Sequence, residues 1–110
     1  MWNEPSTETL GRIPELYSTE ATKWQEKYIY EHFFIFDSDW FIAEYCPRDR
    51  LFFGYAILNG DLQNSEWGYA AFDELRAVKH LGVEIDRDLY WKVRKASEVE
   101  KIVLGHRDRA

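Results

Sequence analysis

The sequence predicts an α+β fold: an antiparallel β-meander of four to five strands with two or three short helices packed on it. Two observations lead to this prediction. In residues 51–72, two aromatic runs (LFFGYAIL and EWGYAAF) flank a polar loop, which is the pattern of a β-hairpin turning at Asn59, Gly60 and Asp61. Before this hairpin the chain is strand-like, and after Phe72 its apolar residues recur at helical spacing.

Four strands are expected in chain order. Residues 27–36 (KYIYEHFFIF) carry large apolar groups in both alternating sets, as in a strand covered on both faces. A turn at Asp-Ser-Asp (37–39) leads to residues 40–45 (WFIAEY), which end before Pro47. Residues 51–58 and 66–72 complete the meander through short connections.

The segments around this sheet predict short helices. Residues 9–17 have helical spacing, with Pro14 either in the first turn of a late helix or as a break. A helix is expected from Phe72 to a C-cap at Gly82. Residues 85–93 are interpreted as a charged edge strand, which leaves a homodimer through an edge strand open. A last helix over 96–104 is expected to end at Gly105.

Length and composition indicate one domain over residues 1–110, with flexible ends at 1–8 and 105–110. The single cysteine excludes an internal disulfide and a multi-cysteine metal site. Neither a membrane-spanning run nor a signal peptide is visible in the sequence, so we expect a cytoplasmic protein.

The chain is acidic, with a net charge of −6. Residues 1–74 hold 14 acids against 5 bases, whereas residues 75–110 hold 9 bases against 6 acids. An acidic body disfavours direct nucleic-acid binding, which needs Lys and Arg against phosphates. It favours a partner with a basic surface, or simply solubility.

Several motifs together resemble a family of small bacterial proteins catalogued as a domain of unknown function, common on plasmids, phages and integrative elements. The matching stretches are IPELYSTE, DSDW, LFFGY, WGY followed by FDEL, and DRDLYW, in this order between residues 13 and 91. The resemblance implies a mobile genetic element as the source, but no catalytic residues. The chain departs from the family pattern in its short connection around Pro47, which puts any function of that loop in doubt.

No motif predicts a cofactor, a metal or an enzyme. Cys46 with His32 could form a nucleophile and base, but nearby acids disfavour a thiolate. The pairs Asp37/Asp39 and Asp86/Asp88 could hold a divalent cation, yet turns and edges explain them as well. His80 and His106 lack companions at ligand spacing and are interpreted as solvated side chains.

The 19 aromatic residues exceed what one face of a small sheet can hide. We therefore expect a partner-binding patch in which outward-facing acids alternate with rings along one rim of the sheet. Its predicted members are Asp37, Asp39, Trp40, Glu44, Tyr45, Asp61, Glu66 and Trp67.

This pattern predicts a non-enzymatic interaction protein that inhibits host defence, as an anti-CRISPR or anti-restriction factor. It would bind a protein or ribonucleoprotein of the defence system and block its basic nucleic-acid-binding surface. The alternatives are a small enzyme or ligand-binding domain with a pocket beneath the helices, or an accessory protein of plasmid or phage maintenance.

Overall fold

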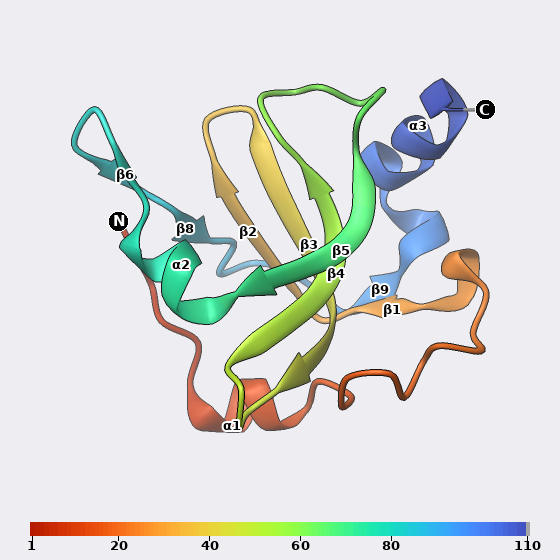
Figure 1. Ribbon diagram of the computed structural model, residues 1–110, viewed down its shortest axis with the longest axis horizontal. Helices are drawn as coiled ribbons and strands as arrows, with labels where there is room; N and C mark the ends of the chain where they lie inside the picture. Colours follow the sequence, from red (N-terminus) through yellow and green to blue (C-terminus); the bar gives the residue numbers. More distant parts are fainter. Residues whose placement is uncertain (110) are drawn as a thin grey trace.

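The computed structural model describes residues 1–109, which form an α+β fold around a five-stranded antiparallel sheet (Figure 1). Strands β2 to β5 are neighbours in chain order, so the predicted meander is confirmed. The fifth strand, β8, pairs with β2 at the far edge. In sheet order the strands are β5 (Glu66–Ala71), β4 (Leu51–Ile57), β3 (Ser38–Cys46), β2 (Glu31–Ile35) and β8 (Asp86–Arg87).

The first predicted strand is divided in two at Tyr30. Its first part, β1 (Tyr28–Ile29), pairs with β9 (Arg94–Lys95) in a separate two-stranded sheet. Its second part is β2, which pairs Ile35 with Ser38 and so leaves a two-residue turn at Phe36 and Asp37. The turn therefore begins one residue earlier than the sequence suggested.

The first two helices are shorter than predicted. Helix α1 (Thr7–Gly11) is capped by Ser6, whose Oγ accepts a hydrogen bond from the Thr9 amide at 3.1 Å, and it ends before Pro14. Helix α2 (Phe72–Ala77) ends well before Gly82, so the predicted C-cap is wrong.

Gly82 lies instead in a β-hairpin made by β6 (Lys79–His80) and β7 (Val83–Glu84). The turn residues Leu81 and Gly82 both have positive φ, 53° and 78°. Two consecutive positive φ angles match the right-handed twist of the flanking strands, which is why a hairpin replaces the helical turn here.

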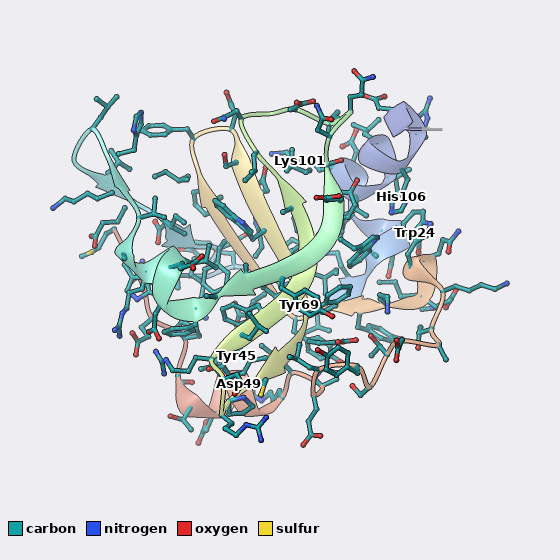
Figure 2. The ribbon with its side chains drawn as sticks, in the orientation of Figure 1. Trp24, Tyr45, Asp49, Tyr69, Lys101 and His106 are labelled. Atoms are coloured by element: carbon teal, nitrogen blue, oxygen red, sulfur yellow. The ribbon has the colours of Figure 1, made fainter. Side chains whose placement is uncertain are left out.

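The predicted helix end at Gly105 is also wrong. A 3-10 turn, η2 (Ala96–Glu98), leads into α3 (Glu100–Arg109), which passes through Gly105. Beyond it, His106 stacks on Trp24 with ring centroids 3.8 Å apart (Figure 2). Ala110 lies outside the described residues, and flexibility of the two ends stays a prediction.

Core side chains cover both faces of the sheet. One face packs beneath α1, α2 and the N-terminal segment, where the ring of Trp2 stacks on Phe33 with centroids 5.6 Å apart. The other face packs beneath η1 (Trp24–Glu26), η2 and α3, with Tyr55 and Ile102 fully buried. Coverage on both sides explains the apolar residues in both alternating sets of β2 and β3. Among residues 1–109, no helix is long and apolar enough to cross a bilayer.

Candidate functional site

The structure joins His32, Asp39, Asp88 and Lys101 in one hydrogen-bonded cluster. His32 and Asp39 lie on the same face of the β2–β3 hairpin, with His32 Nε2 2.7 Å from Asp39 Oδ1. The other ring nitrogen, Nδ1, lies 3.3 Å from Asp88 Oδ2. Lys101 reaches down from α3 to Asp39 Oδ2 at 2.9 Å. Segments far apart in sequence are thereby tied to the sheet.

Asp39 is the buried centre of this cluster, with 2 % of its surface exposed. Burial by itself would raise the pKa of Asp39, but the hydrogen bonds and positive charges of His32 and Lys101 outweigh it. The pKa of Asp39 therefore lies below its ordinary value. The carboxylate is held ionised as a structural anchor.

Both ring nitrogens of His32 face carboxylates. Asp39 is the nearer of the two carboxylates, at 2.7 Å against 3.3 Å for Asp88. The ring is stacked on Phe41, with centroids 4.5 Å apart, and Trp91 lies against it as well. Both ring nitrogens of His32 therefore face carboxylates within the cluster.

Cys46 and His32, which the sequence analysis considered as a nucleophile and base and disfavoured, do not lie together. His32 lies opposite Phe41, whereas Cys46 lies opposite Leu51 at the other end of β3. Among residues 1–109, no group of three His, Cys, Asp or Glu side chains is arranged to hold a metal ion. The Asp86 and Asp88 carboxylates instead accept hydrogen bonds, Asp86 from Asn3 and Asp88 from His32.

The predicted outward-facing patch is wrong for three of its members. Asp39, Glu44 and Tyr45 are 2–3 % exposed. Glu44 points into the loop before η1, where its Oε1 accepts the Tyr17 amide at 2.7 Å and its Oε2 accepts the Thr19 amide at 3.2 Å. β3 is covered on both faces, so alternation along it cannot place these side chains in solvent.

The remaining members are accessible to different degrees. Trp40 and Trp67 are half-buried against the two cores. Asp37, Asp61 and Glu66 are exposed. Asp37 and Asp61 lie in two turns that are joined, because the Gly60 amide donates to the Asp37 carbonyl at 2.9 Å.

Around these two acids lie exposed apolar side chains that the sequence reasoning did not identify. Phe36 is 62 % exposed, and its ring contacts His80 edge-on at 6.0 Å. Phe36 and Tyr90 line one cavity of about 480 Å³, whose floor holds His32 and Asp39. Figure 1 shows the tips of the β2–β3, β4–β5 and β6–β7 turns along the same end of the molecule. We call this surface the turn rim; it comprises Phe36, Asp37, Leu58, Asp61, Leu81 and Tyr90.

Phe36 and Leu81 each have two energetically unfavourable features in the isolated chain. Both have positive φ, 49° and 53°, a conformation that costs a residue with a side chain about 1–2 kcal/mol. Both also expose large apolar surface, and Leu81 is 85 % exposed. Exposed residues held in such a disfavoured backbone conformation are often found at functional positions. One signal was visible beforehand: a bulky apolar residue stands directly beside turn-forming Asp37 and Gly82.

No family model, curated protein or solved structure matches this chain.

Proposed function

We propose that this chain is a non-enzymatic binding protein of a mobile genetic element, which inhibits host defence as an anti-CRISPR or anti-restriction factor. It covers a basic nucleic-acid-binding surface of its target with the turn rim. The source rests on the motif resemblance, and the mode of action rests on the rim. The observation that carries the proposal is Phe36, an exposed ring with a positive φ in a turn of that surface.

The rim combines the two features that a blocking surface needs. Phe36, Leu58, Leu81 and Tyr90 are each more than half exposed and supply apolar anchors. The adjoining Asp37 and Asp61 are exposed carboxylates, which attract a basic partner and set its orientation. Aromatic anchors beside acids favour steric covering of a protein surface over imitation of a phosphate backbone.

The arrangement of His32 supports binding over catalysis. Its two nitrogens are both engaged, and Cys46 lies at the opposite end of β3. A ligand-binding domain is the second candidate, since the cavity beside Phe36 and Tyr90 has a polar floor. In that case a small molecule, and not a macromolecule, would protect Phe36 and Tyr90 from solvent.

The test is a competition assay with purified CRISPR effector and restriction complexes. The native protein is expected to reduce DNA binding by one member of the panel, and to remain bound to it in stoichiometric amount. Phe36→Asn removes the ring but suits the positive φ, and it should weaken inhibition by about tenfold or more, as expected for an anchor worth over 1.4 kcal/mol. Charge reversal at Asp37 and Asp61 should weaken it most at low salt.

Tyr28→Asn is the matched control, because Tyr28 is a half-exposed ring on β1, away from the turn rim. It should inhibit as the native protein does. Equal inhibition by Phe36→Asn and the native protein would remove the rim from the mechanism. Absence of any effect across the panel would overturn the proposed function.

A further inference from the structure

Another cavity, of about 330 Å³, lies against the β4–β5 hairpin, and none of its lining residues belongs to the turn rim. Four of its lining residues are aromatic: Phe53 on β4, Trp67 and Tyr69 on β5, and Tyr17 in the loop that follows α1. Phe53 lies directly opposite Tyr69, and Trp67 is two residues before Tyr69, so these three rings share one face of the sheet. Tyr17 completes the group from outside the sheet.

The rings of this group stand at different angles, so they form walls and not one flat stack. The Tyr69 ring is inclined at 58° to Phe53 and at 61° to Tyr17, with centroids 5.3 Å and 6.3 Å apart. The rings of Phe53 and Trp67 are nearly parallel, at 16°. Tyr17 is 61 % exposed and Tyr69 is 54 % exposed, which leaves ring surface open to a ligand. Rings that converge on one space are typical of cages that hold an organic cation by cation–π attraction.

A buried carboxylate holds Tyr17 at this cavity. The φ of Tyr17 is 70°, in the left-handed region that is disfavoured for a residue with a side chain. Glu44, which is 3 % exposed, accepts the Tyr17 amide at 2.7 Å and also accepts the amide and the hydroxyl of Thr19. The backbone that carries the ring is therefore fixed before a ligand arrives, which reduces the entropy lost on binding.

The charges around the cavity favour a cation. Glu44 is a buried lining residue and Glu20 an exposed one. Lys27 also lines the cavity, but it is buried and donates to the Thr19 carbonyl at 2.5 Å and to the Thr19 hydroxyl at 3.0 Å. Two carboxylates against one ammonium leave a net negative charge. The pKa of Tyr69 is raised, first by partial burial and also by the negative charges of Glu44 and Glu20.

The kind of cation follows from the acceptors that remain. Lys27 Nζ lies 5.8 Å from the ring centroid of Phe53, and its N–H groups also use the oxygens of Thr19. Both oxygens of Glu44 already accept amides, from Tyr17 and Thr19. A further cation with N–H groups would therefore lack buried acceptors. A trimethylammonium group carries its charge without N–H groups and is held by ring faces.

We propose that this cavity binds a trimethylammonium group, with Tyr17, Trp67 and Tyr69 as its aromatic walls and Glu20 as the charge at its mouth. The ligand is a small cation such as choline, or the side chain of a trimethylated lysine. It carries no phosphate or carboxylate beside the cation, because Lys27 already pairs with Thr19. The site goes beyond the proposed blocking function and does not depend on it, since the two surfaces share no residue.

An NMR titration with choline tests the site. Choline is expected to shift the indole N–H of Trp67 and the backbone amides of Tyr17 and Tyr69 in a saturable manner. Three comparison ligands should each bind about tenfold more weakly or worse: ethanolamine, phosphocholine, and the uncharged isostere in which tert-butyl replaces trimethylammonium. A peptide with one trimethyllysine distinguishes the two sources of the group. Tighter binding by the peptide assigns the site to a protein side chain, and tighter binding by choline assigns it to a free cation.

Variants separate the rings from the charge. Tyr69→Leu keeps an apolar side chain without the ring, and Tyr17→Asn removes the ring while suiting the positive φ; each should weaken choline binding about tenfold. Tyr69→Phe should bind as the native protein does, and so should Tyr28→Asn, a ring outside the cavity. Glu20→Gln should weaken binding most at low salt, whereas exposed Glu15→Gln in the same loop should not.

The proposal is overturned if choline causes no saturable shift at Trp67, Tyr17 or Tyr69. Equal binding of the uncharged isostere would reduce the site to an apolar pocket, and equal or tighter binding of ethanolamine would remove the preference for a methylated cation. Native affinity in Tyr69→Leu would place the contact elsewhere. Circular dichroism checks that each variant is folded, and the competition assay on the turn rim is expected to be unaffected by Tyr69→Leu.

Discussion

The imidazole of His32 donates to the buried carboxylate of Asp39 across 2.7 Å, and Lys101 of α3 donates to the other oxygen of the same carboxylate. One side chain thus joins the β2–β3 hairpin to the C-terminal helix. Because Asp39 has almost no solvent contact, its removal leaves Lys101 Nζ and His32 Nε2 without the carboxylate between them.

Asp39→Asn is expected to lower the free energy of unfolding by about 3 kcal/mol at neutral pH. The folded-state pKa of Asp39 is lowered, so its contribution is complete above the unfolded-state value of about 3.9 and is lost as pH falls through the folded-state value. The difference between native and variant should therefore shrink on acidification. Urea denaturation at neutral and acidic pH measures this difference in the free energy of unfolding. A difference that does not change with pH would contradict the anchoring role, and exposed Asp61→Asn serves as the control.

Gly105→Ala is expected to destabilise the protein by about 1–3 kcal/mol, although alanine is the better helix former. An added Cβ would collide with the hydroxyls of Tyr55 and Ser65, which lie on the facing side of the core. Gly11→Ala, in α1 with open space around it, is the matched control and should be neutral or stabilising. Thermal denaturation of the two variants compares them. Equal effects would mean that α3 does not pack closely at Gly105.

Glu44→Gln is expected to loosen the loop before η1. Glu44 accepts the backbone amides of Tyr17 and Thr19 and the Thr19 hydroxyl, and Lys27 Nζ holds the Thr19 carbonyl at 2.5 Å. Loss of the charge should cost about 1–3 kcal/mol. Hydrogen exchange should accelerate at the Tyr17 and Thr19 amides, while β4 stays protected. Exposed Glu20→Gln should leave these rates unchanged.

Leu81→Asn is expected to raise the free energy of unfolding by about 1 kcal/mol. Asn-Gly suits the two positive φ angles of the β6–β7 turn better than Leu-Gly does. If the turn rim binds a partner, the same change should weaken inhibition in the competition assay, so stability and function move in opposite directions. Chemical denaturation measures the change in stability, and the competition assay measures the change in inhibition. Lower stability would show that Leu81 packs against the chain after all.

The meander was predictable because its signals are local. The polar loop around Gly60 separates two aromatic runs, and Pro47 ends the preceding strand, so short-range pattern fixes neighbouring strands. The predicted helix ends were wrong where the actual backbone conformation or contacts with distant residues override the local preference of glycine for a helix terminus. Gly105 resembles a helix stop, but it is the point where α3 approaches Tyr55. Gly82 resembles a C-cap, but Leu81 before it also adopts a positive φ and turns the chain into a hairpin.

The candidate site was less predictable than the fold. The sequence indicated acids and rings beside one another, and the exposed Asp37 and Asp61 do lie in two turns that the Gly60 amide joins through the Asp37 carbonyl. Glu44 and Asp39 were predicted to face solvent but are buried, because periodicity along one strand cannot tell whether helices cover its second face. Phe36 and Leu81 were not among the predicted binding residues, because the exposure of a turn residue depends on how the neighbouring turns pack.

By itself the sequence determined the α+β class, the order of the four meander strands and the acidic balance of the chain, since these depend on composition and on spacing between near neighbours. Only the tertiary structure decided which carboxylates are buried and which rings stay in solvent. The physical reason is that burial depends on residues far away in sequence, such as Lys101 over Asp39, whose positions no local pattern records.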